Sequence, residues 1–189
     1  MGKFQFKKCG DFEGLYLIQP GVFGDARGYF METYNYNDFK EAGLDMVFVQ
    51  DNQSRSTKGV LRGLHFQKEH TQGKLVRVIS GEVFDVVVDI RKGSKTFGKW
   101  FGVTLSAEKK NMFYVPKGFA HGFYVLSETA EFFYKCTDFY DPSSEAGIPW
   151  NDENIGIDWP IPEGVTPILA KKDTEYPAFS KDIAMEGLL

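Results

Sequence analysis

Short apolar runs, each ended by turn-forming residues, dominate this chain and limit the folds that it can adopt. The runs recur at short intervals and are rich in β-branched and aromatic side chains, which favour strands. About ten short strands at this spacing predict an all-β sandwich or barrel. The expected strands are GLYLIQP, GYFMETYN, MVFVQDNQS, GVLRGLHF, KLVRVIS, EVFDVVVDI, KWFGVTL, MFYVP, GFYVLS and EFFYKCTDFY.

Helix signals are scarce. One short helix is expected over Asn37–Gly43, which begins with Asn, has acidic residues in its first turns and ends with Gly. The SGEV sequence around Gly81 predicts a tight hairpin between two strands. After Tyr140 the chain is rich in Pro, Gly, Asn and Asp, with too little apolar periodicity for a core of its own. We therefore expect one domain over residues 1–189, with a loop-rich C-terminal extension that wraps the barrel.

Charge and cysteine content limit the partners and the compartment. The net charge is −4, so there is no general attraction for nucleic acid or acidic membranes, and an anionic ligand needs a local Arg and Lys cluster. Cys9 and Cys136 form no metal or redox motif and are expected to be free thiols. The N-terminus has no apolar signal region, and no apolar run reaches membrane-spanning length. These features predict a cytoplasmic protein without membrane or nucleic-acid partners.

Aromatic residues are abundant, with 18 Phe, 9 Tyr and 3 Trp. This content suits strands and an aromatic-lined pocket, and it is equally compatible with a bulky dimer interface. The composition does not choose between these two uses.

The chain has three histidines, and two of them lie on expected strands. His70 lies in the polar loop QKEHTQG and is expected to be solvated and without a role. A strand histidine is by default a hydrogen-bonded core or edge residue, but His65 and His121 both lie near Gly-containing turns, which favours a functional role as much as a structural one.

The stretch VLRGLHFQ places Arg62 and His65 on one apolar strand, although both side chains are costly to desolvate without partners. They are an odd number of positions apart, so they can point into one pocket only if the strand bulges or twists. Gly63 between them makes such a distortion cheap. Alternatively, Arg62 reaches over the rim of the barrel.

GVLRGLH and PKGFAH have the spacings of the paired motifs of cupins, jelly-roll barrels whose inward-facing histidines usually bind a metal, and so resemble that family. In a metal-binding cupin the first motif continues with a second His and then a Glu. Here those positions hold Gln67 and Lys74. An ammonium repels a divalent cation, and too few imidazoles and carboxylates remain for three or four ligands. We expect a cupin barrel that has kept its pocket and contains no metal.

A metal-free pocket of this kind suits removal of a proton next to a carbonyl. That reaction needs a base in reach and a positive group where the enolate oxygen forms. A neutral His65 suits the base if a carboxylate fixes its tautomer, and Lys74 supplies the charge. A second acid is needed to return the proton to the opposite face, and a tyrosine on a facing strand would serve.

Longer motifs narrow the resemblance. FGDARGYFMETY, VQDNQS, GVLRGLHFQ, QGKLVRVISGEVFDVVVDIR, PKGFAHGFYVLSETAEFFYKCTDFYDPSSE, WND, IGIDWPI and ILAKKD resemble the dTDP-4-dehydrorhamnose 3,5-epimerase family from about Phe23 to Asp173. The resemblance implies a homodimeric cupin-type isomerase of dTDP-L-rhamnose biosynthesis that uses no metal or organic cofactor. Its expected reaction is epimerisation of dTDP-4-dehydro-6-deoxy-D-glucose at C3 and C5.

The resemblance also implies residue roles. His65 is the expected base, oriented by Asp173; Tyr134 is the acid on the other face; and Lys74 stabilises the enolate oxygen. Arg27 and Arg62 are expected to hold the diphosphate, because an Arg fork fits phosphate oxygens better than Lys does. The other expected contacts are His121 near the sugar, Glu32, Gln50, Asp51 and Asn52 at the nucleotide end, Phe23 and Tyr140 on thymine, and Glu145 and Lys172 at ligand-contact positions.

Several of these residues look ordinary without the resemblance. Asp173 would be a solvated loop acid, and nothing local chooses Tyr134 over Tyr140. Arg77 and Arg91 are interpreted as surface or interface charges. The family often has Ser where this chain has Ala170, a departure that bears on the contact of Lys172 but leaves the pair of Lys172 and Asp173 intact.

Three other hypotheses remain open at this stage. Single-site epimerases share nearly all these residues. A metal-dependent cupin would contain bound iron, manganese or zinc, which Gln67 and Lys74 argue against. A non-catalytic sugar-nucleotide binding module would need the arginines and aromatic residues but not the set of His65, Lys74, Tyr134 and Asp173.

Overall fold

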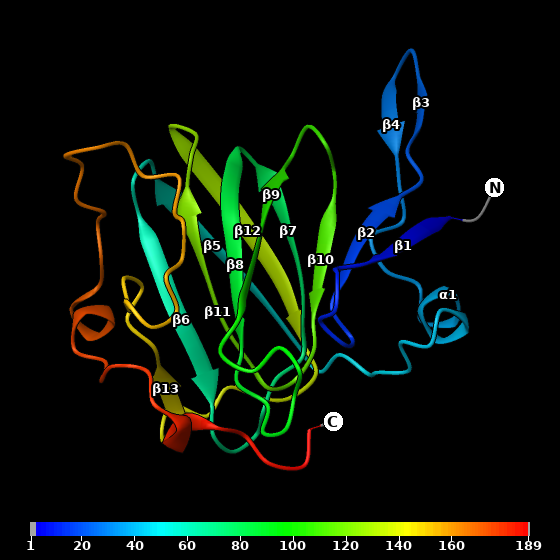
Figure 1. Cartoon of the computed structure of the whole chain (residues 1–189). Helices are drawn as coiled ribbons and strands as arrows, with labels where there is room; N and C mark the ends of the chain where they lie inside the picture. The colour runs from blue at the N-terminus through cyan, green and yellow to red at the C-terminus, as the bar shows by residue number, and fades with distance from the viewer. Residues whose placement is uncertain (1–2, 189) are drawn as a thin grey trace.

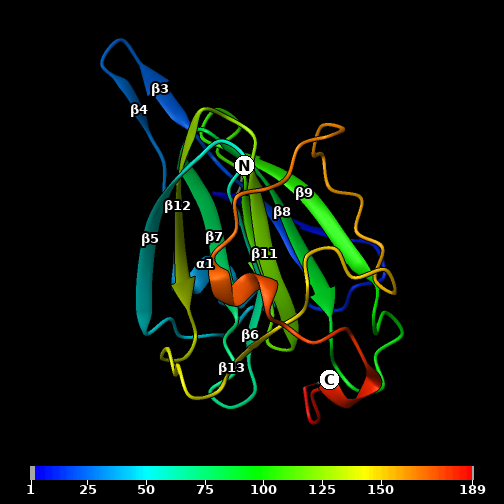
Figure 2. The same cartoon turned by 90° about the vertical axis from the view of Figure 1, so that its left-hand side faces the viewer.

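Two facing antiparallel sheets form the body of the protein in the computed structural model, which describes residues 3–188 (Figures 1 and 2). The first sheet has the strand order β1-β2-β10-β7-β12-β5, and the second has the order β13-β6-β11-β8-β9. From β5 to β13 the chain changes sheet at almost every connection, which is the arrangement of a jelly roll. The predicted all-β cupin-type barrel is therefore confirmed.

Most strands lie where the apolar runs predicted them. The strands of the first sheet are β1 (Phe4–Lys8), β2 (Tyr16–Pro20), β5 (Gln50–Thr57), β7 (Lys74–Ser80), β10 (Met112–Val115) and β12 (Thr129–Cys136). Those of the second are β6 (Leu61–Gln67), β8 (Glu82–Asp89), β9 (Trp100–Ser106), β11 (Phe119–Val125) and β13 (Glu145–Gly147). Sequence analysis missed β1, β13 and the short strand β3 (Phe23–Asp25), and of the expected strand GYFMETYN only β4 (Gly28–Phe30) forms. It also began β5 too early, because Val47 and Val49 are exposed rather than paired in a strand.

The connection at Gly81 differs from the predicted hairpin. Gly81 joins β7 to β8, but these strands belong to different sheets, so the turn carries the chain across the sandwich. Its φ is +79°, and an added Cβ would lie 2.1 Å from the Thr129 carbonyl oxygen. Glycine is therefore required for this crossing.

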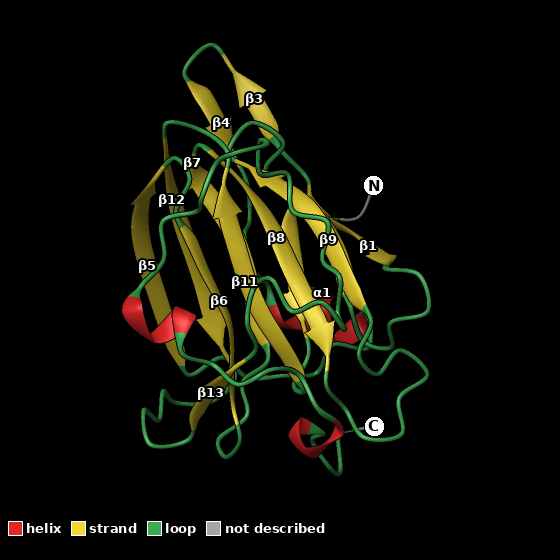
Figure 3. Ribbon diagram, turned by 60° about the vertical axis from the view of Figure 1, so that its left-hand side comes forward, coloured by secondary structure: helices red, strands yellow, loops and turns green. Residues whose placement is uncertain are grey.

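Helical structure is limited to short pieces, as expected (Figure 3). Helix α1 spans Tyr36–Glu41, and its N-cap is Asn35, whose side chain accepts hydrogen bonds from the backbone of Asn37 and Asp38. The predicted helix began too late because Asn37, not Asn35, was taken as its start. Two 3-10 turns follow near the C-terminus, η1 (Lys171–Thr174) and η2 (Lys181–Ile183). No helix among residues 3–188 has both the length and the apolar character to cross a membrane.

Three apolar clusters hold the fold together. One lies between the two sheets and includes Val76, Val87, Phe113 and Phe132. A second covers the outer face of the five-stranded sheet, where the C-terminal extension packs Trp159 against β6 and β8 residues. The third packs Phe39 of α1 against the N-terminal strands. The extension therefore wraps the barrel, as predicted, and shares its core.

Arg91 departs from the interpretation of Arg77 and Arg91 as surface or interface charges. It is only 3% exposed. Its guanidinium donates to both carboxylate oxygens of Asp89, at 2.9 and 2.7 Å, and lies 4.5 Å from the ring centre of Phe119. A bidentate carboxylate and an aromatic face make this burial tolerable. Arg77 is half-buried over the Phe133 ring.

Cys9 and Cys136 are both buried free thiols, as predicted.

A hairpin formed by β3 (Phe23–Asp25) and β4 (Gly28–Phe30) projects away from the barrel (Figure 1). Phe23, Tyr29 and Phe30 are each at least 60% exposed. Large apolar side chains gathered on a projecting element are typical of a surface that another molecule covers.

Candidate active site

A cavity of about 530 Å³ opens between the two sheets and contains the predicted catalytic residues on its walls. His65 and His121 come from the five-stranded sheet, whereas Lys74 and Tyr134 come from the six-stranded sheet. Facing sheets pack roughly 10 Å apart. A sugar ring held between them would therefore meet the histidines on one face and Tyr134 on the other.

His65 is held by Asp173, although the two residues are far apart in sequence. Turn η1 carries Asp173 to β6, where the Asp173 Oδ1 lies 2.7 Å from the His65 Nε2. The Asp173 Oδ2 accepts a hydrogen bond from the backbone of Gly63. Burial alone would raise the pKa of Asp173, but the hydrogen bond from His65 brings it below the usual value. Ionised Asp173 requires Nε2 to carry a proton, so Nδ1 of neutral His65 keeps its lone pair.

A β-bulge brings Arg62 and His65 into the same cavity, which confirms the predicted distortion. The pairing of β6 with β11 shifts register between the pairs His65–His121 and Arg62–Phe123. Gly63 lies in this bulge with φ +117°, and an added Cβ would lie 2.6 Å from the Gly122 Cα. Only glycine lets the two backbones approach so closely. The Arg62 side chain lies at the cavity edge and donates from Nε to Ser56 Oγ at 3.0 Å.

The opposite wall supplies a positive charge and a phenol. Lys74 lies at the start of β7, and burial lowers its pKa below the ordinary value of 10.5. Among residues 3–188, no group hydrogen-bonds to its ammonium, so it is available to a ligand. Burial raises the pKa of Tyr134 to about 12, so this phenol stays protonated at neutral pH and can act as an acid.

A second His–Asp pair, which sequence analysis missed, lies beside the first. His121 is paired directly with His65 across β11 and β6, and its Nε2 lies 2.9 Å from Oδ1 of Asp85 on β8. Asp85 is fully buried, and burial raises its pKa despite the nearby His121 and Lys74. An Asp in the middle of the apolar run EVFDVVVDI was the signal that could have indicated this partner.

Polar and aromatic side chains surround the cavity mouth. Glu145 forms an ion pair with Lys172 and accepts a hydrogen bond from the Tyr140 hydroxyl at 2.8 Å. Gln50 and Asn52 point into the cavity from β5 and are joined by a hydrogen bond of 3.0 Å. These five residues were all predicted as ligand contacts. Gln72, which lines the same cavity, was not.

Four predicted contacts lie outside this cavity. Asp51 is between Gln50 and Asn52 on β5, so it faces the other side of the sheet, where it pairs with Lys135. Phe23 and Arg27 are on the projecting hairpin, and Glu32 follows it and pairs with Lys3. Within one copy of the chain, these residues do not join the His65 site.

The residues described here offer no metal centre. Among residues 3–188, no group of three or more His, Cys, Asp and Glu side chains is arranged to hold a metal ion. Lys74 stands at the position of the cupin Glu ligand. Its ammonium lies in the cavity instead of a carboxylate.

Comparison with known proteins identifies the family. The family model described as dTDP-4-dehydrorhamnose 3,5-epimerase matches residues 10–181. A dTDP-4-dehydrorhamnose 3,5-epimerase from Methanothermobacter thermautotrophicus is 53% identical over 176 residues, which are 93% of this chain and 95% of the relative. The chain belongs to the dTDP-4-dehydrorhamnose 3,5-epimerase family.

Solved structures of epimerases share this fold. The crystal structure of dTDP-4-dehydrorhamnose 3,5-epimerase from Elizabethkingia anophelis is 54% identical, with a TM-score of 0.90, and the match covers 96% of this chain and 98% of that one. A dTDP-6-deoxy-D-glucose-3,5-epimerase from Legionella pneumophila, solved in complex with dTDP-4-keto-L-rhamnose, is 49% identical, with a TM-score of 0.90 and 97% and 98% coverage. The protein is thus an isomerase of the epimerase class.

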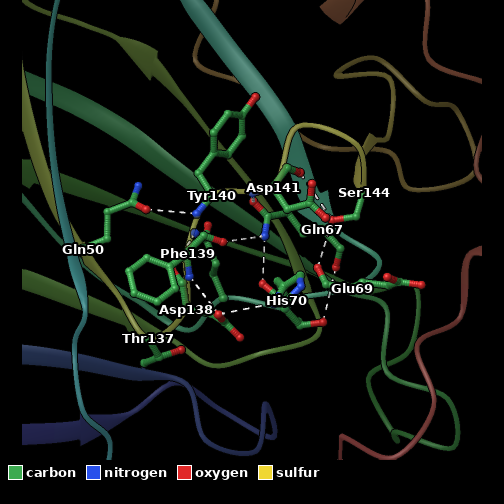
Figure 4. Close-up of polar contacts among 12 residues, drawn as sticks. Gln50, Gln67, Glu69, His70, Thr137, Asp138, Phe139, Tyr140, Asp141 and Ser144 are labelled. Carbon is green, nitrogen blue, oxygen red and sulfur yellow. Dashed lines mark hydrogen bonds and ion pairs between the residues drawn. The ribbon is translucent and has the colours of Figure 1, made fainter.

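In this epimerase-family chain, Gln67 occupies the second histidine position of a metal-binding cupin and joins two loops (Figure 4). Its Nε2 donates to the carbonyls of His70 and Phe139, at 2.8 and 3.1 Å, and its Oε1 accepts from the backbone of Asp141 at 3.0 Å. Gln67 is 5% exposed, and both the nitrogen and the oxygen of its amide take part in these contacts. It therefore fixes the loop that carries Tyr140. The His70 side chain is exposed, as predicted, and its Nδ1 lies 3.6 Å from the Asp138 Oδ1.

Proposed function

We propose that this protein converts dTDP-4-dehydro-6-deoxy-D-glucose to dTDP-4-dehydro-L-rhamnose by inverting C3 and C5, with His65 as the base. The observation that carries the proposal is the distribution of chemically different side chains between the two sheets. An imidazole with a free nitrogen lies on one wall, and an ammonium and a phenol lie on the other. This arrangement suits removal of a proton from one face of a sugar and its return from the other.

The first step is proton transfer from carbon to His65 Nδ1. The C4 ketone makes the C3 and C5 protons acidic because the electron pair left behind moves to O4 as an enolate. The imidazolium that forms is stabilised by the Asp173 carboxylate at 2.7 Å, just as the negative charge moves onto the substrate. The Lys74 ammonium stabilises O4 in a site shielded from water, where a charge acts more strongly.

The second step is proton return from Tyr134. Its hydroxyl gives a proton to the face of the enolate opposite His65, and the carbon is inverted. C3 and C5 flank the same ketone, so one base and one enolate clamp serve both centres in turn. His121, held by Asp85, lies next to His65 and contacts the sugar.

The nucleotide lies toward the cavity mouth. Arg62 binds the diphosphate there, and Gln50, Asn52 and Lys172 contact the remaining polar groups. Tyr140 is 53% exposed at the edge of the cavity, where its ring can stack on thymine. The Glu145 ion pair and hydrogen bond keep Tyr140 and Lys172 at this edge.

The protein acts as a cytoplasmic homodimer of single-domain subunits. The hairpin cannot bring Phe23 and Arg27 to its own cavity, yet it exposes Phe23, Tyr29 and Phe30. A second copy of the chain accounts for both the position of Phe23 and Arg27 and the exposed aromatic residues, because each hairpin would complete the nucleotide end of its partner's site. Asp51 and Glu32 would lie at the same interface. Size measurement in solution tests the dimer, and a monomer with full activity would reject this part of the proposal.

Proton NMR of the 4-ketosugar nucleotide with enzyme in heavy water tests the reaction. We expect solvent deuterium at both C3 and C5 and the L-rhamno product. Label at C3 alone would indicate a single-site epimerase, and tight dTDP binding without turnover would indicate a binding module.

Two variants test the residue roles. His65→Ala should lose exchange altogether, at a cost of at least several kcal/mol in barrier, since each tenfold in rate is about 1.4 kcal/mol. Tyr134→Phe should still exchange protons while returning mostly the starting configuration. Equal exchange by the wild type and His65→Ala would reject the base assignment.

A further inference from the structure

A second cavity, of about 730 Å³, adjoins the active site, because Glu145 lines both. Its walls come from β6, β13 and the C-terminal segment that follows η1. Tyr176 lines this second cavity and is not among the described residues that line the first. Its side chain therefore faces the second cavity rather than the first.

The ring of Tyr176 also contacts the catalytic imidazole. Its centre is 5.9 Å from that of the His65 ring, and the two planes meet edge to face at 72°. Gly147, the register partner of His65 across β13 and β6, makes room for this ring. A Cβ on Gly147 would lie 2.4–2.6 Å from three of the Tyr176 ring carbons. The sequence thus leaves a space that the tyrosine ring fills.

The hydroxyl of Tyr176 contributes little to this contact. Among residues 3–188, no group forms a well-aligned hydrogen bond with this buried hydroxyl, and the Glu145 carboxylate nearby has only a small effect on its pKa. Burial is the main cause that raises the pKa of Tyr176, and the negative charges of Asp173 and Glu145 raise it further. The phenol therefore stays neutral. A neutral phenol of this kind acts here as an aromatic wall rather than as an acid or a charge.

We propose that Tyr176 is a positioning residue for His65. Its ring holds the imidazole in the orientation in which Nε2 faces Asp173 and Nδ1 faces the substrate cavity, and it separates this pair from the second cavity. The inference rests on the proposed role of His65 as the base. Removing the ring frees the imidazole to rotate and lets water reach Asp173 from behind, although every substrate contact remains.

Steady-state kinetics of Tyr176→Ala and Tyr176→Phe test this role. We expect kcat of Tyr176→Ala to fall about tenfold or more, because small misplacement of a catalytic group is costly, while KM stays within about twofold. Tyr176→Phe keeps the ring and should retain wild-type kcat. Gly147→Ala, which pushes the ring away from the other side, should lower kcat like Tyr176→Ala. Tyr36→Ala, at an exposed tyrosine of α1, is the matched control.

Nitrogen-15 NMR of the imidazoles gives a readout that does not depend on turnover. With only three histidines in the chain, the His65 signals can be assigned by comparison with His65→Ala. The wild type should show one tautomer with the proton on Nε2, and Tyr176→Ala should show averaged or mixed signals. Wild-type kcat and an unchanged His65 tautomer in Tyr176→Ala would overturn the proposal, as would Tyr176→Phe being as impaired as Tyr176→Ala. Absence of solvent exchange in the wild type would instead reject the proposed function.

Discussion

Replacing Asp173 by Asn tests the proposal that this carboxylate sets the tautomer in which His65 acts as a base. The Asp173 carboxylate accepts two hydrogen bonds, one from His65 Nε2 at 2.7 Å and one from the Gly63 backbone at 3.3 Å. Asn has nearly the same shape but has one acceptor oxygen and one donor NH₂ group. Because Asp173 is 2% exposed, water cannot supply the missing acceptor. The effect of Asp173→Asn therefore depends on which of the two neighbours receives the remaining oxygen.

Each orientation of the new amide disables something different. If the oxygen accepts from Gly63, the NH₂ group faces His65 Nε2 and moves the imidazole proton to Nδ1, so the nitrogen facing the substrate is blocked. If the oxygen faces His65, two donors meet at Gly63, and an unsatisfied buried donor costs about 1–3 kcal/mol. The first orientation is favoured by that amount, and it leaves the wrong tautomer.

The expected loss in kcat is roughly 10³–10⁴-fold. In a serine protease triad the equivalent Asp-to-Asn change lowers kcat by about 10⁴ through the same tautomer error. That factor corresponds to about 5.5 kcal/mol in barrier height. The folded state should be little affected, because the favoured orientation keeps the Gly63 hydrogen bond.

Deuterium incorporation at C3 and C5, followed by proton NMR in heavy water, measures the loss, and nitrogen-15 NMR of His65 reports the tautomer. Asp152→Asn is a useful control, because Asp152 is also a buried acceptor of backbone hydrogen bonds but lies in the C-terminal extension. An exchange rate in Asp173→Asn within tenfold of the wild type, with His65 protonated on Nδ1, would refute the reasoning.

Two further predictions concern residues that replaced cupin metal ligands. Lys74→Met should abolish turnover yet stabilise the fold by about 1 kcal/mol at neutral pH, because it removes a partly desolvated charge that has no hydrogen-bonded partner among residues 3–188. The folded state lowers the pKa of Lys74, so the free energy of unfolding of the wild type rises with pH between this lowered pKa and the ordinary 10.5, and the stability advantage of Lys74→Met shrinks over the same range. Urea unfolding at several pH values measures this, and a destabilised variant would contradict it. Gln67→Leu should raise KM about tenfold with little change in kcat, because it frees the loop of Tyr140. Initial-rate kinetics measures this, with Gln53→Leu as the control because Gln53 is an exposed residue of β5. An unchanged KM would contradict the prediction.

The two His–Asp pairs have similar geometry but differ in exposure. His65–Asp173 and His121–Asp85 have closely similar nitrogen–oxygen distances, at 2.7 and 2.9 Å. The His65 side chain is 25% exposed and opens to the cavity, whereas the His121 side chain is 7% exposed. A base must reach its substrate, so exposure rather than pairing favours His65.

Much of this protein could be predicted from local sequence. The apolar runs between turn-forming residues indicated most strands of the barrel, because β-branched and aromatic side chains favour strands. The two histidine motifs and Gly63 indicated the pocket and the bulge, because only glycine fits where an added Cβ would lie 2.6 Å from a neighbouring backbone atom. Lys74 and Gln67 pointed away from a metal through their chemistry alone.

Tertiary structure decided what depends on contacts distant in sequence. Asp173 looks like a solvated loop acid in the sequence, and only the packing of η1 against β6 buries it beside His65. Asp85 became the partner of His121 because β8 and β11 are adjacent. Gly81 joins two sheets rather than two paired strands, since strand pairing is set by the whole sandwich. Local patterns give each residue's face and conformation, whereas its neighbours across the sandwich are fixed only when the sheets close on each other.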